Sequence, residues 1–230
     1  MRYVSVVSTT GLHPLTSKPD SITDMVFDAI RDAIVSKALP PGSRISESSL
    51  ATQLNVSKTP VRETLLRLRH VGLVEPAGRS LRVIMPAADR IRDAYELRAG
   101  LERAAVGYAA TRANDTERDE IAHAAEASLT RAKAGDSAGF RRHDRDFHRA
   151  IASASHNQLL TEAINDALVL TSALRWRDVP DSGDSVVCGN EHVQIAKAVR
   201  QGKPDAASVA LADHIHHVMA MVLDSIPATS

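Results

Sequence analysis

The pattern of the sequence changes at Pro86, and this change limits the possible fold more than any other feature. Before Pro86, short helical patterns are mixed with two short runs that favour strands. After Pro86, apolar residues recur with the period of an α-helix in every segment. The sequence therefore predicts a mainly α fold made of a flexible tail at 1–20, a winged helix-turn-helix at 21–86 and an all-helical region at 87–226.

The region before Pro86 has the element order of a winged helix-turn-helix. The expected elements are a helix from Ser21 that stops at 39–42, a helix at 47–54, a helix at 58–70, and strands at 72–75 and 81–84. Pro60 suits the first turn of the third helix, where a missing N–H is not needed. This order places the third helix as the one that enters the major groove of DNA.

The region after Pro86 predicts a six-helix antiparallel bundle. The expected helices cover 88–112, 115–134, 136–155, 157–176, 186–201 and 204–226. Gly, Pro, Asn and Asp residues separate them, and most of the connections are short. Short connections between helices of this length favour antiparallel neighbours around one core.

The net charge of zero hides an uneven distribution of charge. The chain has 28 basic and 28 acidic side chains, but residues 1–88 hold 11 basic against 7 acidic ones. The segment from Arg44 to Arg82 alone has seven basic and three acidic side chains. A local basic excess is typical of a nucleic-acid site, although a surplus of this size also occurs on an ordinary solvated face.

Cysteine content and hydropathy exclude several classes of protein. The single cysteine, Cys188, excludes an intramolecular disulfide framework and a Cys-rich zinc module. No run of 18 apolar residues exists, and the first residues lack the apolar stretch of a secretory signal. We therefore expect a cytoplasmic location and no membrane partner.

The start of the third helix has the side chains that DNA contact requires. Ser57, Lys58 and Thr59 form an exposed first turn that suits phosphate oxygens, and Arg62 lies one turn further on. The Arg62 guanidinium can bind guanine through two hydrogen bonds. Arg44 and Arg79 are expected to flank this helix. The alternative is that these basic residues only solvate a helix surface.

Three histidines and one aspartate in the bundle form a candidate metal site. Asp144 and His148 are four residues apart and share one helix face, while His192 and His214 lie in the last two predicted helices. Three imidazoles and a carboxylate fill most of the coordination shell of a divalent transition metal. The alternative is that each is an isolated surface histidine, because spacing alone cannot show that separate helices converge.

The DNA-reading region resembles the GntR family of bacterial transcription regulators. The resemblance rests on 41–51, on the Val-Ser-Lys-Thr-Pro-Val-Arg-Glu-Thr-Leu run at 56–65, and on 68–74. It implies that Arg62 and Lys58 read the operator, that Ser57 and Thr59 bind its backbone, and that Gly78 is the wing glycine. Ser48 and Lys58 stand where the family usually has Arg, which leaves the operator sequence open.

Residues 90–222 resemble the FCD ligand-binding domain of FadR-type GntR regulators. The matching features are the segments at 95–102, 144–151, 155–157 and 191–192, and His214. The resemblance implies that Asp144, His148, His192 and His214 hold a divalent ion, zinc ahead of nickel or manganese, beneath a pocket for a small carboxylate. It also implies that Arg98 faces the effector, the alternative being an ion pair with Glu102. Six bundle helices favour the VanR-like subgroup.

These features together predict a homodimeric transcription regulator that represses from a palindromic operator. A small organic acid would bind at the metal site and change the affinity for DNA. One alternative is a metal-dependent enzyme tethered to DNA, although no general base at defined spacing and no nucleotide-binding glycine loop supports it. The other alternative is a regulator whose metal ion is purely structural.

Overall fold

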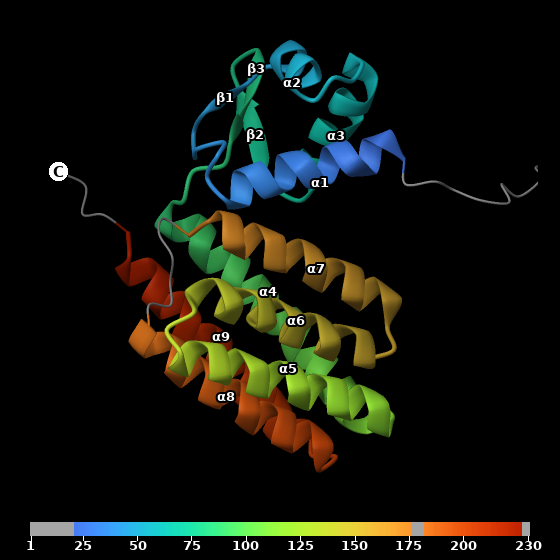
Figure 1. The fold of residues 1–230 in the computed structure, drawn as a ribbon, viewed down its shortest axis with the longest axis vertical. Helices are drawn as coiled ribbons and strands as arrows, with labels where there is room; N and C mark the ends of the chain where they lie inside the picture. Colours follow the sequence, from blue (N-terminus) through green and yellow to red (C-terminus); the bar gives the residue numbers. More distant parts are fainter. Residues whose placement is uncertain (1–20, 176–181, 227–230) are drawn as a thin grey trace, which may run out of the picture.

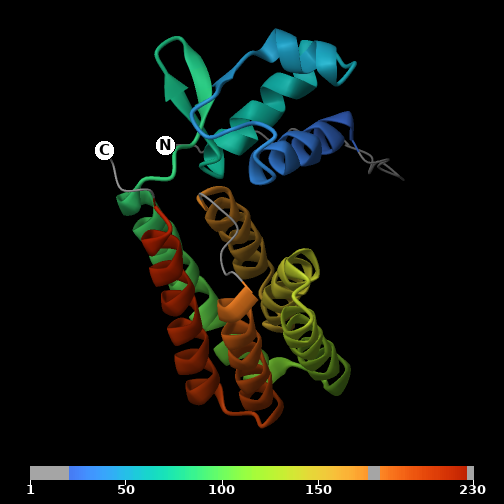
Figure 2. The same cartoon turned by 60° about the vertical axis from the view of Figure 1, so that its left-hand side comes forward.

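The chain folds into an N-terminal module of short elements set on a bundle of long helices (Figures 1 and 2). The computed structural model describes residues 21–175 and 182–226, so the tail predicted at 1–20 lies outside the described residues. Within them, nine helices and three short strands confirm the mainly α fold with a winged helix-turn-helix followed by six bundle helices.

The N-terminal module surrounds its own apolar core. Its elements are α1 (Ile22–Val35), β1 (Arg44–Ile45), α2 (Glu47–Gln53), α3 (Lys58–His70), β2 (Val74–Ala77) and β3 (Ser80–Val83). The strands form an antiparallel sheet in the order β1-β3-β2. One apolar face of α1 meets one of α3, and the core includes Val26, Ile30, Ile34, Val61, Leu65, Leu68 and Leu73.

The predicted hairpin is present, but its strands lie closer to the turn than expected. Ala77 pairs with Ser80, so the turn contains only Gly78 and Arg79. Gly78 has a φ of +64°, a value that glycine adopts without strain. Pro76 fits within β2 because this strand is at the edge of the sheet. The two-residue strand β1 was not expected.

The bundle consists of the six predicted helices with small shifts at their ends. They are α4 (Ala88–Arg112), α5 (Asp115–Lys133), α6 (Ser137–Ala154), α7 (Gln158–Ala173), α8 (Ser182–Arg200) and α9 (Pro204–Asp224). The helix predicted at 157–176 begins one residue before α7 and was expected to continue past Ala173, with its last residue outside the described residues. Helix α8 begins four residues earlier than predicted. Tyr95, Phe140, Phe147 and Ile151 are among the large side chains of the bundle core.

Helix α9 is the one described helix that is long and apolar enough to span a membrane by composition. In the structure it packs along α4 and against α8. Its buried residues, among them Leu211 and Ile215, belong to the bundle core. Packing in the bundle therefore accounts for the apolar residues on the buried face of α9.

Helix α7 connects the two parts of the molecule. Ala173, at its C-terminal end, belongs to the apolar core of the N-terminal module, whereas Ile84, after β3, belongs to the bundle core. The Lys37 ammonium group, after α1, donates a hydrogen bond of 2.5 Å to the Ala173 carbonyl. The N-terminal module therefore touches the bundle through α1 and α7 (Figure 1).

Candidate functional site

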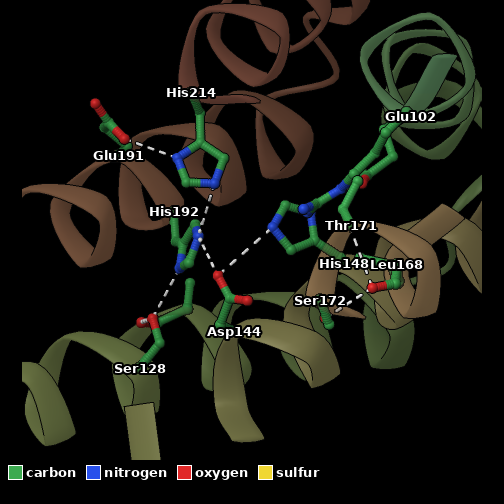
Figure 3. Close-up of polar contacts among 12 residues, drawn as sticks. Glu102, Ser128, Asp144, His148, Leu168, Thr171, Ser172, Glu191, His192 and His214 are labelled. Atoms are coloured by element: carbon green, nitrogen blue, oxygen red, sulfur yellow. Dashed lines mark hydrogen bonds and ion pairs between the residues drawn. The ribbon is translucent and has the colours of Figure 1, made fainter. Parts of the chain in front are cut away.

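The structure brings the four predicted metal ligands together (Figure 3). Asp144 and His148 come from α6, His192 from α8 and His214 from α9, and one ligand atom of each lies within 4.8 Å of all the others. The Asp144 Oδ1 atom is 3.5 Å from His192 Nε2 and 3.8 Å from His148 Nε2. The three histidines are almost fully buried.

Each of these histidines has its outer nitrogen, Nδ1, held by an oxygen atom. Glu102 Oε2 lies 2.5 Å from His148 Nδ1, and Glu191 Oε2 lies 2.7 Å from His214 Nδ1. His192 Nδ1 lies 2.9 Å from the Ser128 hydroxyl, which donates its own proton to the Ala125 carbonyl and so accepts from the histidine. Oxygen partners of this kind fix the tautomer and orientation of metal-binding histidines.

The three inner nitrogens are consequently acceptors turned toward one another. Burial, reinforced by the neighbouring imidazoles His214 and His148, holds the pKa of His192 well below its ordinary value. Burial also lowers the pKa of His214, so both rings are neutral near pH 7. Their Nε2 atoms nevertheless lie only 3.2 Å apart, and His148 Nε2 is buried without a hydrogen-bond partner. A cation between these lone pairs removes both conflicts.

The charge of Asp144 completes a donor set suited to a divalent transition metal. Burial would raise the pKa of Asp144, but the neighbouring His148 and Arg175 side chains outweigh it and keep this pKa below the ordinary value. The site thus offers three imidazole nitrogens and one carboxylate oxygen. A second group, Cys188 with Glu191 and His214, shares His214 with this site, and burial raises the pKa of its thiol above the ordinary value.

Arg98 forms the ion pair with Glu102 that was the alternative to contact with the effector. Its Nε atom lies 2.5 Å from Glu102 Oε1, and both side chains are buried. Burial would raise the pKa of Glu102, whereas the neighbouring Arg98 and His148 side chains lower it to about 2. Arg98 therefore holds Glu102 ionised against His148.

Sequence reasoning did not identify the residues that hold the histidines. Glu102 was named only as an ion-pair partner of Arg98. Its place four residues after Arg98 is the sole local signal in the sequence, and it points to Arg98 rather than to His148. Ser128 gave no signal, because it lies on another helix than His192 and 64 residues before it in sequence. Glu191 was noted beside His192, yet it contacts His214 instead.

A cavity of about 830 Å³ opens beside Asp144. Its wall is formed by α6 and α7 of the bundle and by α1 of the N-terminal module. Basic side chains dominate the wall: Arg31, Lys37, Arg141, Arg145, Arg149 and Arg175. The sequence did not suggest this grouping, and Arg98 is not part of the wall.

The predicted DNA-contacting residues are all exposed. Ser57, Lys58 and Thr59 form the start of α3, and the Ser57 hydroxyl makes no capping hydrogen bond. The free N–H groups of this first turn and the Ser57 hydroxyl are thus available to a phosphate. The N-terminal module lies at the opposite end of the molecule from the lower half of the bundle (Figure 1).

Two further features shape this surface. The Arg62 guanidinium is paired with Glu47 of α2 at 3.0 Å, and both side chains remain partly exposed. Exposed pairs of this kind contribute about 0–1 kcal/mol, so a guanine can displace Glu47. Gly78 and Arg79 form the exposed tip of the hairpin. Arg44 of β1 lies opposite Arg82 of β3 in the backbone register of the sheet.

Both modules match known protein families. The family described as "Bacterial regulatory proteins, gntR family" matches residues 22–80, and the family described as "FCD domain" matches residues 93–217. The second match alone covers more than half of the chain. The two matched ranges fall on the N-terminal module and on the bundle.

Similar full-length proteins are transcription regulators. The HTH-type transcriptional repressor NanR of Citrobacter rodentium is 33% identical over 230 aligned positions, which cover 90% of this chain and 86% of that protein. The Nta operon transcriptional regulator of Aminobacter aminovorans is 33% identical, with 84% of this chain and 90% of that protein covered.

Solved structures share the fold. E. coli McbR/YncC superposes with a TM-score of 0.76 at 23% identity and covers 89% of this chain and 98% of its own. A GntR regulator from Rhodococcus sp. RHA1 superposes with a TM-score of 0.68 at 25% identity, with coverage of 89% and 99%.

Proposed function

This chain belongs to the GntR family of bacterial transcription regulators, in the group with a C-terminal FCD domain, and from this premise we propose that it is a repressor controlled by a small carboxylate at a divalent-metal site. The family consists of DNA-binding regulators, so the chain is not an enzyme. Repression is supported by the relatives named as repressors. A cytoplasmic location follows because the operator DNA is there.

DNA binding is assigned to α3 and the hairpin. Arg62 and Lys58 approach base edges in the major groove, whereas Ser57 and Thr59 bind phosphate at the start of the helix. Arg44, Gly78 and Arg79 contact the flanking backbone. The exposure of all seven residues on one module supports this assignment.

A metal site at Asp144, His148, His192 and His214 is the core of the proposal. The observation that carries it is that three buried Nε2 atoms face a carboxylate, each on a ring whose Nδ1 is already held by oxygen. We assign zinc, ahead of nickel or manganese, because three imidazoles and one carboxylate make a four-ligand set that zinc commonly takes. When bound, the ion would supply a positive charge that attracts a carboxylate.

The chain's own residues position this centre. Glu102 and Glu191 orient His148 and His214 and add negative charge behind the rings. Arg98 keeps Glu102 ionised, so we assign it a positioning role, in place of direct contact with the effector. The cavity beside Asp144 gives the carboxylate its path to the centre.

We also propose a homodimer on a palindromic operator. One winged module reads only a half-site, and two modules spaced by about one helical turn supply affinity and specificity. Sedimentation at micromolar concentration should give about twice the 24.7 kDa of one chain. Six bundle helices favour the VanR-like subgroup.

A thermal-shift panel of small monocarboxylates and polycarboxylates tests the effector site. At least one acid should raise the melting temperature of zinc-loaded protein and change its operator affinity, because it binds the native state. Chelator-treated protein should show no shift. Equal shifts with and without metal would make the ion purely structural, and a panel without any shift on loaded protein would contradict the proposal.

A further inference from the structure

The basic cavity beside Asp144 lies between the DNA-reading module, which is the N-terminal module at 21–86, and the bundle. Arg31 and Lys37 reach it from α1 and the turn that follows, while Arg145 and Arg149 reach it from α6. Its lining holds six basic side chains and only two acidic ones, Asp32 and Asp144. If Asp144 is neutralised by a metal ion, the excess of positive charge in the wall is larger still.

Within the described residues, Arg31 is paired with Asp28 and Asp32 of its own helix, whereas two arginines of α6 have no such partner. Among residues 21–175 and 182–226, neither Arg145 nor Arg149 forms an ion pair. Clustered guanidinium groups repel one another, and a structure that keeps them together around a cavity is suited to an anion. The volume of about 830 Å³ lies in the range of small-molecule sites.

Arg31 of the DNA-reading module and Arg149 of the bundle both line this cavity. Both also line a second cavity of about 590 Å³, which continues between α1 and α7. The two residues therefore share a wall although they belong to different modules. The space between α1 and the bundle is only partly filled by protein, so a ligand there can change how the modules are joined.

Helix α1 is firmly connected to the recognition helix α3. The Arg67 guanidinium of α3 pairs with Asp24 at 2.7 Å and lies 4.2 Å from the centre of the Phe27 ring. The Thr23 hydroxyl of α1 donates to Glu63 at 2.9 Å, and the Thr64 hydroxyl of α3 donates to the Thr23 carbonyl at 3.2 Å. A ligand that holds α1 therefore also holds α3.

We propose that the effector is an organic acid with at least two separated anionic groups, which bridges the two modules. One carboxylate binds at the Asp144 end, and a second group, carboxylate or phosphate, binds between Arg31 of α1 and Arg149 of α6. The contact of the first carboxylate rests on the proposed function, whereas the contact of the second group does not. The second contact joins the effector to the DNA-reading module without a relay through the bundle core.

The test compares ligands with one anionic group and with several on zinc-loaded full-length protein. Calorimetric titration with butyrate, tricarballylate and 3-phosphoglycerate measures affinity, and zinc content is checked after each titration. Tricarballylate or 3-phosphoglycerate should bind at least tenfold more tightly than butyrate, and the preferred one identifies the second group. Arg31→Gln and Arg149→Gln should each weaken the tighter ligand at least threefold while butyrate affinity stays within twofold.

Arg92→Gln is the matched control, because Arg92 is an exposed, ion-paired arginine of α4 outside both cavities. It should leave every affinity unchanged. Equal affinity for all three ligands, or no effect of Arg31→Gln, overturns the bridge while butyrate binding leaves the proposed function standing. If none of the three ligands binds, both the bridge and the proposed function are overturned.

Discussion

Each central histidine is held by an oxygen from a helix other than its own. Glu102 of α4 reaches His148 of α6, Ser128 of α5 reaches His192 of α8, and Glu191 of α8 reaches His214 of α9. The Phe147 ring also stacks on His192, with ring centres 4.5 Å apart. The rings are therefore fixed before any ligand arrives, which lowers the entropic cost of forming a coordination shell.

Glu191→Ala should weaken zinc affinity by about 10- to 100-fold, because His214 loses the acceptor that orients its ring. Glu191 is partly exposed, so the variant is expected to fold. Competition with a chromophoric chelator measures the affinity. Glu126→Ala, an exposed glutamate of α5, is the control, and equal zinc affinity in the two variants would contradict the orienting role.

Arg62→Ala should weaken operator binding at constant salt by more than about 1 kcal/mol, because two hydrogen bonds to guanine are lost. A mobility-shift titration measures the change. Arg69→Ala removes an equal charge near the other end of α3 and should have a smaller effect. Unchanged binding by the Arg62 variant would exclude the residue from operator reading.

Among the helices, the site joins three segments that are distant in sequence. Its ligands come from α6, α8 and α9, and the residues behind them come from α4, α5 and α8. A bound ion therefore links most of the bundle, and its removal affects stability as well as ligand binding.

Treatment with EDTA should lower the melting temperature of zinc-loaded protein by several degrees, because native-state binding contributes about 4 kcal/mol at a thousandfold excess over Kd. Added zinc should restore the original value. The His214→Ala variant should respond much less to EDTA. A response as large as that of the unaltered protein would show that the stabilising ion binds elsewhere.

The sequence predicts helices well because their signals are local. The bounds of α3 and α4 agree with the prediction, since Ser57, Pro60 and Pro86 lie near their starts. The strands β2 and β3 differ by one or two residues, because the tight turn at Gly78 lets pairing continue toward the tip.

The candidate site was predictable only in part, for a physical reason. Asp144 and His148 share a helix face, and His192 and His214 were proposed as partners from the last two predicted helices. Only the resemblance to a family implied that these helices converge. Contacts between separate helices, such as Ser128 with His192, have no local signature. The basic cavity was not predicted because it needs the placement of α1 on the bundle, which no spacing in the sequence records.

The division of charge is matched by the architecture of the whole molecule. The basic segment from Arg44 to Arg82 lies in the DNA-reading module, and residues 89–230, with 17 basic and 21 acidic side chains, include the bundle (Figure 2). The two parts meet at α1 and α7, around cavities rather than a fully packed interface. Such an interface suits a regulator in which a bound ligand changes how the DNA-reading module is positioned on the bundle.

Elemental analysis of the purified chain and of His192→Ala is the most direct test of the metal-dependent sensor. The unaltered chain is expected to carry about one divalent ion per chain, and the variant clearly less, because one of the three inward nitrogens is lost. A protein that retains no divalent ion after incubation with zinc, nickel or manganese and removal of excess would contradict the metal site and the carboxylate sensor built on it.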